Sequence, residues 1–284
     1  MSARRQRQDA TPRQDTAADA CSGDTAQTPL RPVKTVIVGA RGRMGSMLLD
    51  RARNAGLAVA GVDTPLTAQT LTPACADAEL ALVCVPAAVF REVTARVCAH
   101  LPPTAVLADI TSVKEIPLRQ MEELWPGPVV GTHPLFGPNP DPQADQPVTI
   151  VPGRRAGPRH TALATGFFTA LGCRVFFADA EEHDKAMACI QNMNFITSLA
   201  YFALLAGHKE LLPFLTPSFR RRLDAARKML TEDARMFAGL FEANPHSAAA
   251  VRRYRRMLSL AAAGDIDLLC RLARWWWEDE GGNS

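Results

Sequence analysis

The chain has 284 residues, of which 47% are hydrophobic and 21% are charged, and its formal net charge at pH 7 is +3. This near-neutral balance excludes the strongly basic composition of typical nucleic-acid-binding proteins, and no apolar run approaches the length of a membrane span. A chain of this length can build two modest domains, each with its own core.

The first 32 residues are rich in Arg, Gln, Asp, Thr and Ala, and they lack the apolar stretch of a secretory signal peptide. Such a composition buries too little apolar surface to fold, so we predict a disordered tail over residues 1–32. Seven cysteines are scattered along the chain without C-x-x-C spacing, which predicts neither a disulfide framework nor a metal site. These features are typical of a cytoplasmic protein.

The segment Val36–Gly45, VIVGARGRMG, has the pattern of a buried strand followed by a glycine-rich turn and a helix. Gly39, Gly42 and Gly45 lack a Cβ atom, so the backbone can turn sharply and offer the N–H groups of the helix N-terminus to a pyrophosphate. Asp63 follows a second apolar strand, and its carboxylate is placed to accept hydrogen bonds from a ribose diol. Together they predict an NAD-binding βαβ unit.

The glycine spacing is G-x-x-G-x-x-G, whereas the usual nucleotide-binding pattern has glycine at the position of Arg41. A tight turn that binds nothing is therefore the alternative. The charge of Asp63 repels a 2′-phosphate and favours NAD over NADP, although Arg41, Arg43 and Thr64 lie close enough in sequence to weaken that preference. The predicted cofactor-binding residues are Gly39, Arg41, Gly42, Arg43, Met44, Gly45, Asp63, Val85 and Pro86.

Short apolar runs alternate with helical patterns up to about residue 180. Runs such as LALVCVP and AVLADI are apolar on both faces, as expected of parallel strands covered by helices. We therefore predict an α/β domain over residues 33–180, with a Rossmann-type doubly wound parallel sheet whose ligands lie beyond the carboxyl ends of its strands. The predicted strands are Val33–Val38, Leu57–Val62, Leu80–Val85, Ala105–Ile110, Val129–Gly131, Val148–Val151 and Arg174–Phe177.

Two polar side chains follow strands of this predicted sheet. Ser112 comes after Ala105–Ile110, where it would either cap the next helix or orient a catalytic group. His133 lies in GTHPLFGP, directly after Val129–Gly131, where two prolines and two glycines stiffen the backbone of a short loop. We predict that this loop presents His133 to the cofactor side of the sheet as a catalytic residue.

Strand patterns end near residue 180, and residues 181–284 are predicted to be all-helical. The stretch Asn194–Ala206 is apolar nearly all round, which predicts burial between subunits or domains and a homodimer. At the start of this region Glu182, His183 and Asp184 form a polar turn, in which we interpret Asp184 as a helix cap. The predicted helices are His183–Leu205, Pro217–Ala243, His246–Ala263 and Asp265–Glu280.

Four segments, GARGRMG, SVK, GTHPLFGP and EEHDKAMACIQ, occur in this order and resemble the prephenate dehydrogenase family. The likeness is to the dehydrogenase module of bacterial chorismate mutase/prephenate dehydrogenases, and it runs from about Val33 to the WWWE segment near the C-terminus. It implies a Rossmann domain followed by a helical dimerisation and substrate domain. It also implies NAD-dependent oxidative decarboxylation of a cyclohexadienyl pyruvate, in aromatic amino acid biosynthesis.

By position, His133 matches the catalytic histidine of that family and Ser112 the serine that helps to orient it. A neutral imidazole near its unperturbed pKa of about 6.5 would accept the proton that the C4 substituent of the ring loses when hydride leaves C4. Loss of CO₂ then makes the ring aromatic and the reaction effectively irreversible.

The chain departs from the family in two predicted substrate-binding segments. Asn194 and Phe195 stand where the family usually carries a basic residue and a histidine, and Lys228, beside Arg227, aligns near a carboxylate-binding arginine. A lysine keeps the charge but loses the bidentate fork. Asn194 and Phe195 favour the 4-amino-4-deoxy analogue of prephenate slightly, as in antibiotic biosynthesis, over prephenate itself.

Two other functions remain open at the level of sequence. One is a β-hydroxy-acid dehydrogenase of the same fold, which we would expect to place a catalytic lysine in the helix between its domains. The other is a non-catalytic NAD-binding sensor, which would not need Ser112 and His133.

Overall fold

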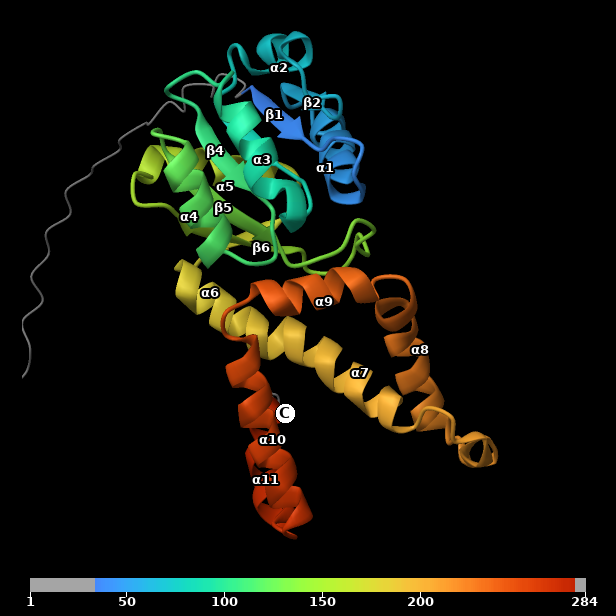
Figure 1. The fold of residues 1–284 in the computed structure, drawn as a ribbon. Coiled ribbons are helices and arrows are strands. Elements are labelled where there is room, and N and C mark those ends of the chain that lie inside the picture. Colours follow the sequence, from blue (N-terminus) through green and yellow to red (C-terminus); the bar gives the residue numbers. More distant parts are fainter. Residues whose placement is uncertain (1–33, 279–284) are drawn as a thin grey trace, which may run out of the picture. The chain divides into compact units, whose positions relative to one another are not determined.

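The computed structural model describes residues 34–278, and the predicted tail, residues 1–32, lies outside them. Within the described residues the chain forms a seven-stranded sheet in the order β2-β1-β3-β4-β5-β6-β7 (Figure 1). Neighbouring strands are parallel except β5 and β6, which are antiparallel. The strands are β1 (Thr35–Val38), β2 (Val59–Val62), β3 (Leu80–Val83), β4 (Val106–Asp109), β5 (Val129–Pro134), β6 (Pro147–Pro152) and β7 (Arg174–Phe177).

All seven predicted strands are present, but two features differ from the prediction. The sheet is not wholly parallel, because β6 runs against β5. This pairing also lengthens β5: Thr132 opposes Ile150 and His133 opposes Thr149. The prediction that His133 lies in a loop after the strand is therefore wrong, since ladder pairing with β6 holds it inside β5.

Alternate residues of the central strands face two separate cores. Val36 and Val38 of β1 belong to a cluster with side chains of α2 (Ala68–Cys75), α3 (Ala87–Cys98) and α4 (Glu115–Leu124). Ile37 points the other way, toward α1 (Arg43–Asn54) and α5 (Pro158–Ala170). Strands that are apolar on both faces thus acquire helices on both faces, which is the doubly wound arrangement (Figure 1).

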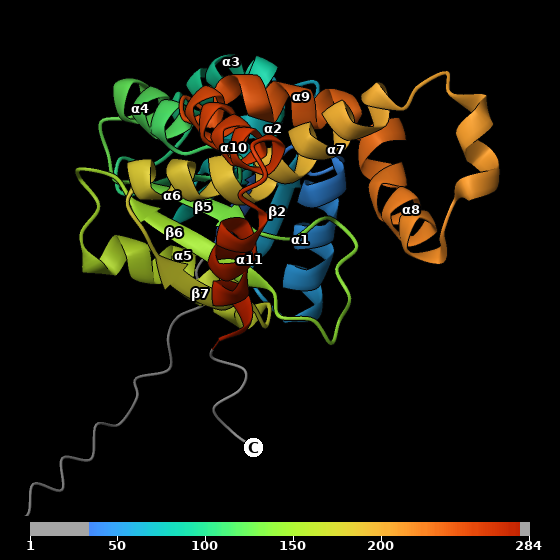
Figure 2. The same ribbon diagram turned by 90° about the horizontal axis from the view of Figure 1, so that it is seen from below.

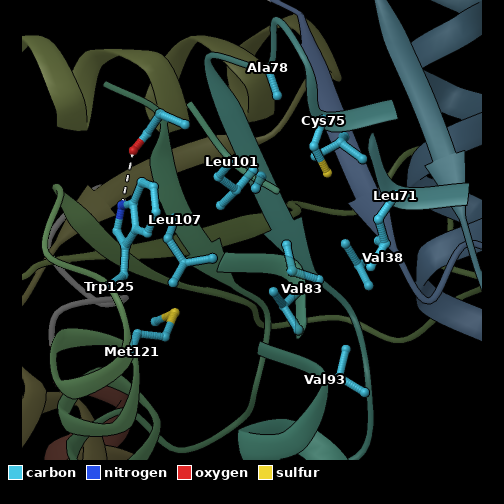
Figure 3. Close-up of a cluster of buried hydrophobic side chains, with 14 of the residues drawn as sticks. Val38, Leu71, Cys75, Ala78, Val83, Val93, Leu101, Leu107, Met121 and Trp125 are labelled. Carbon is cyan, nitrogen blue, oxygen red and sulfur yellow. Dashed lines mark hydrogen bonds between the residues drawn. The ribbon is translucent and has the colours of Figure 1, made fainter. Parts of the chain in front are cut away.

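Trp125 closes the first of these cores at the end of α4 (Figure 3). Its indole Nε1 donates a hydrogen bond of 3.2 Å to the backbone oxygen of Ala105, just before β4. The buried ring therefore keeps a partner for its polar N–H group while its apolar surface packs beside Met121 and Leu107.

From Ala180 onward the described chain is helical, and this part forms its helical half (Figure 2). The predicted helix His183–Leu205 is continuous in space but changes its winding, because a π-helical turn over Ala188–Asn192 separates α6 from α7. The predicted helix Pro217–Ala243 is broken at Glu232 and Asp233. The helices are α6 (Ala180–Met187), α7 (Met193–Leu204), α8 (Pro217–Thr231), α9 (Ala234–Ala243), α10 (Ser247–Ala262) and α11 (Ile266–Arg274), with 3₁₀ turns at Lys209–Phe214 and Trp275–Trp277.

The π-helical turn is the packing centre of this half, since both α9 and α10 contact it. There the buried Asn192 donates a hydrogen bond of 2.9 Å to Ser247 of α10. α6 also contacts α4 of the sheet layer. Among the described residues, none of the helices combines the length and apolar character needed to cross a membrane.

Candidate functional site

The turn after β1 is shaped to receive a ligand at the N-terminus of α1. Gly39 has φ +87°, and a Cβ atom there would lie 2.4 Å from the backbone oxygen of Cys84. A Cβ atom on Gly45 would lie 2.1 Å from the oxygen of Gly39. Gly42 is the N-cap residue of α1 and offers no side-chain cap, so the first N–H groups of the helix are left for an anion.

A hollow of about 300 Å³ opens beside this turn, at the carboxyl ends of β1, β2 and β3. In a doubly wound sheet this is where the strand order reverses and ligands bind. Six of the predicted cofactor-binding residues line it, namely Gly39, Arg41, Gly42, Asp63, Val85 and Pro86, together with Thr64, Leu66, Cys84, Val89 and Val93.

The other three predicted cofactor-binding residues lie in the first turn of α1, outside that lining. Met44 and Gly45 belong to the helix itself. The guanidinium of Arg43 reaches the carboxylate of Asp233, at the start of α9, with both of its terminal nitrogens 3.0 Å from Oδ1. Arg43 thus joins the glycine turn to the helical half of the chain.

Asp63 stands at the rim of the hollow with its carboxylate held in place. The backbone N–H groups of Arg41 and Thr64 donate to it at 2.8 and 2.7 Å. Burial alone would raise the pKa of Asp63, but these hydrogen bonds outweigh it and lower the pKa below its ordinary value. The anion is positioned to accept hydrogen bonds from a diol, whereas a phosphate would meet a negative charge.

His133 is buried in β5, with 3% of its surface exposed, and is bonded to a second histidine. Its Nδ1 lies 2.9 Å from Nε2 of His183, on α6. Nδ1 of His183 in turn lies 2.8 Å from Oδ1 of Asp184. The imidazole that the sequence singles out is thus the first member of a buried chain of three side chains.

Asp184 joins this chain to the start of α4. Its Oδ1 accepts from the backbone N–H of Lys114 at 2.7 Å, and its Oδ2 from that of Glu115 at 2.9 Å. The interpretation of Asp184 as a cap of its own helix is wrong, because Asp179 caps α6 by accepting from the N–H of Glu182 at 2.7 Å. Asp184 instead caps a different helix.

A buried ion pair lies beside the histidines. Nζ of Lys114 is 2.6 Å from Oδ2 of Asp109 and donates at 2.7 Å to the backbone oxygen of Thr132. The side chains of Lys114 and Asp109 are both fully buried. This pair ties the carboxyl end of β4 to β5 one residue before His133.

These surroundings keep His133 neutral. Burial lowers its pKa well below 6.5, and the neighbouring His183 and the charge of Lys114 lower it further. The expectation of an unperturbed pKa near 6.5 is therefore wrong. A buried neutral imidazole has one nitrogen free to accept a proton.

Ser112 lies half-buried in the turn between β4 and α4. The helix-capping alternative fails for it, because the N-cap residue of α4 is Lys114 and the capping acceptor is Asp184. The described hydrogen bond of the His133 ring joins it to His183. An orienting role for Ser112 stays a prediction.

The described contacts of the other predicted substrate-binding residues, Asn194, Phe195, Arg227 and Lys228, do not include His133. Phe195 is 2% exposed and stacks on Phe237 of α9 at 5.6 Å, while Asn194 is exposed. Arg227 and Lys228 are exposed on α8, and Arg227 pairs with Asp224 at 3.4 Å. For Phe195 the described contacts are those of a packing residue.

Sequence reasoning missed the roles of His183, Asp184 and Lys114. One signal for His183 was available: it stands four residues before Met187, and both are buried on α6. A histidine at an apolar position of an amphipathic helix needs a polar partner inside the protein. That partner is His133, fifty residues away in sequence.

Comparison with known proteins finds one matching family model and several relatives. Residues 42–177 match the model described as prephenate dehydrogenase, nucleotide-binding domain. The T-protein of Enterobacter agglomerans is 31% identical over 241 residues, which cover 82% of this chain and 62% of that protein. A probable arogenate/prephenate dehydrogenase of Methanocaldococcus jannaschii is 28% identical over 59% of this chain and 39% of that protein. The chain thus spans less than two thirds of these relatives.

Solved structures share the fold. The prephenate dehydrogenase from A. aeolicus in complex with hydroxyphenyl propionate and NAD+ has a TM-score of 0.70 at 17% identity, covering 87% of this chain and 96% of that one. The Synechocystis arogenate dehydrogenase has a TM-score of 0.69 at 21% identity, covering 87% of this chain and 99% of that one.

The lowered pKa of His133 predicts a pH-dependent stability. The folded protein keeps His133 neutral at pH values where the unfolded chain, with the ordinary pKa of 6.5, already binds a proton. Because the unfolded state then holds more protons, the free energy of unfolding falls as the pH drops below 6.5, by at most about 1.4 kcal/mol per pH unit from this group. Urea denaturation from about pH 7.5 to 5.5 measures it.

The variant His133→Asn should lack this component, so the difference in unfolding free energy between wild type and variant should shrink on acidification. At neutral pH and above, where the imidazole is neutral in both states, the difference should be constant and serves as the internal control. A difference that stays constant throughout the acidic range would contradict the lowered pKa.

Proposed function

Since the chain belongs to the prephenate dehydrogenase family, we propose that it catalyses the NAD-dependent oxidative decarboxylation of a cyclohexadienyl pyruvate. The substrate is prephenate or its 4-amino-4-deoxy analogue, and the products are the 4-substituted phenylpyruvate and CO₂. The observation that carries the proposal is a buried, neutral His133 near the carboxyl end of β5. This is the edge of the sheet at which β1 and β3 open onto the glycine-lined hollow.

The residues of the hollow fit a dinucleotide. Gly39 and Gly45 leave space that a Cβ atom would fill, and the uncapped first turn of α1 suits a pyrophosphate. Asp63 would hold the adenosine ribose through its hydroxyl groups. When bound, NAD would accept the hydride from C4 of the substrate ring.

His133 would move the proton of this reaction. It takes the proton from the hydroxyl or amine on C4 as the hydride leaves, so that a C=O or C=N bond forms. The electrons of the bond to the departing carboxylate then flow into the ring, and the C4 substituent recovers the proton from His133. The same imidazole thus acts first as the base and then as the acid. The ring becomes aromatic when CO₂ departs.

The substituent on C4 is where the two candidate substrates differ. The slight preference for the amine, with its place in antibiotic biosynthesis, depends on Asn194 and Phe195. Phe195 packs on Phe237 and Asn194 is exposed, so their described contacts favour neither substituent. We therefore propose the cyclohexadienyl pyruvate as the substrate class and let the measured rates select the substituent.

The interdomain helix argues against a β-hydroxy-acid dehydrogenase, which we expect to carry a catalytic lysine there. On α6 the available lysine is Lys185, whose side chain is exposed and pairs with Glu181 at 2.6 Å. A lysine in that position makes an i,i+4 surface ion pair.

We also propose that the chain works as a homodimer in the cytoplasm. The six cysteines among the described residues are free thiols, which suits a reducing compartment. Apolar side chains are exposed on α7, α10, α11 and the 3₁₀ turn after it: Leu204 by 71%, Leu258 by 52%, Leu272 by 57%, Trp275 by 65% and Trp276 by 64%. An apolar surface of this kind is stabilised by burial against a partner, for which we propose a second copy of the chain.

The first test is turnover. We expect NADH absorbance to rise when the protein is mixed with NAD and prephenate or 4-amino-4-deoxyprephenate. The variant His133→Asn should lose turnover by about 10²- to 10⁴-fold, because a general base is removed, and should still bind NAD. His160→Asn, which changes a histidine in the first turn of α5 that accepts from the N–H of Gly157, is the matched control. Silence with both substrates would leave the sensor interpretation, and unchanged turnover of His133→Asn would exclude that imidazole as the base.

The second test is cofactor preference. The variant Asp63→Ser should raise the KM for NAD by about tenfold or more, since hydrogen bonds to a charged group contribute about 1.5–3 kcal/mol. The same change should raise kcat/KM with NADP, because the negative charge that faces a 2′-phosphate is gone. Steady-state kinetics with both cofactors measures the shift, with Asp50→Ser, at an exposed position of α1, as control. A wild-type preference for NADP would contradict the assigned role of Asp63.

The third test is assembly. The double variant Leu272→Glu, Trp276→Glu places charges on the exposed apolar surface and should convert the dimer to a monomer in sedimentation equilibrium. Arg274→Glu, two positions from both Leu272 and Trp276 and so on the opposite side of the helix, should leave the dimer intact. A wild-type protein that sediments as a monomer at micromolar concentration would overturn the dimer proposal.

A further inference from the structure

The direction of the hydrogen bonds along the buried chain His133–His183–Asp184 follows from the other bonds that Asp184 makes. Asp184 accepts hydrogen bonds from two backbone N–H groups, one on each carboxylate oxygen, at 2.7 Å from Lys114 and 2.9 Å from Glu115. Backbone N–H groups only donate, so both oxygens act as acceptors. Nδ1 of His183, which lies 2.8 Å from Oδ1, must therefore be the donor of that bond.

With His183 taken as neutral, this assignment fixes the tautomer of both histidines. A neutral His183 with its proton on Nδ1 has a bare Nε2, which can only accept. Nδ1 of His133, 2.9 Å away, must then carry a proton and donate it to that nitrogen. The lone pair of His133 is left on Nε2, the ring nitrogen that is not engaged by His183.

We propose that His183 and Asp184 are positioning residues that hold His133 in the Nδ1–H tautomer and make its Nε2 the base of the reaction. This inference rests on the proposed function and assigns it an atom. His183 and Asp184 act through His133 and need not touch the substrate. They come from α6 of the helical half, whereas the base lies in β5.

The other charged and titratable groups packed around the two histidines and Asp184 are consistent with this direction of the hydrogen bonds. Lys114 and Asp109 form a closed ion pair at 2.6 Å, and the positive charge of Lys114 disfavours a second proton on His133 at rest. Glu115, on α4, pairs at 2.6 Å with His246, which precedes α10. Asp184 is therefore the carboxylate bonded to the histidine chain, and its negative charge is turned toward His183.

The arrangement also supports the charge that the reaction creates. When Nε2 of His133 takes the proton from the C4 substituent, the ring becomes an imidazolium whose Nδ1–H already points to an acceptor. The positive charge is then shared through His183 toward the carboxylate of Asp184. The proton returns from Nε2 to the substituent as CO₂ leaves, so the pair ends the cycle as it began.

A direct test reads the tautomer without activity. Long-range ¹H–¹⁵N spectra of protein labelled with ¹⁵N-histidine distinguish a protonated from a bare ring nitrogen, and His133 is assigned by the signals that disappear in His133→Asn. We expect His133 to carry its proton on Nδ1 in the wild type and to populate both tautomers in Asp184→Ala. That variant removes the oxygen that accepts from Nδ1 of His183, so nothing fixes the direction of the two bonds.

Kinetics provide the second readout. Asp184→Ala should lower kcat by about 10²- to 10⁴-fold with KM changed little, because the carboxylate that orients the two histidines is lost. His183→Gln places an amide oxygen where Nε2 stood and should retain more activity than His183→Asn, whose shorter side chain reaches only the Nδ1 position. We expect at least about a tenfold difference in kcat between these two variants.

The outcomes separate the two proposals. If wild-type His133 carries its proton on Nε2, or if His183→Gln and His183→Asn are equally active, the positioning inference is overturned while the proposed function stands. If His133→Asn keeps full turnover, the proposed function fails whatever the tautomer is. Thermal unfolding of each variant identifies lost folding, and the wild-type spectrum decides the tautomer even if Asp184→Ala does not fold.

Discussion

The carboxylate of Asp184 is the contact on which the described site depends. Its two oxygens bind the first N–H groups of α4, which replaces the side-chain cap that α4 lacks, and the same group orients His183. One buried anion thus stabilises a helix start, attaches α6 to the sheet layer and fixes the histidine next to the candidate base. Its charge is compensated by three donors, as a buried carboxylate requires.

The ion pair of Lys114 and Asp109 also holds the carboxyl end of β4 next to β5, near the buried histidines. A single buried charge would be costly, but here the ammonium meets both a carboxylate and the backbone oxygen of Thr132. The pair places a positive charge near His133 and contributes to its lowered pKa. The backbone N–H of Lys114 binds Asp184, so one residue belongs to both networks.

The parts of the fold that could be predicted from sequence are those governed by local pattern. The strands are continuous apolar runs, and the turn at Gly39 needs a residue that tolerates φ +87°. The placement of His133 could not be predicted in the same way, because its strand extends only through pairing with β6. The partnership of His133 with His183 joins residues fifty positions apart, and no local rule identifies it. Phe195 shows the converse. Its departure from the family pattern indicated a role in substrate recognition, whereas in the fold its ring packs against Phe237.

A candidate base of this kind faces two opposing demands. It must be neutral at rest, which burial, His183 and Lys114 ensure by lowering its pKa, and yet it must become positive when it takes a proton. Burial alone would satisfy the first demand and defeat the second. The described geometry meets both, because the negative charge that favours the imidazolium is placed beyond His183 rather than in direct contact with His133. Separating the carboxylate from the base by one imidazole leaves the resting ring uncharged and still provides an acceptor for its Nδ1–H when the charge arrives.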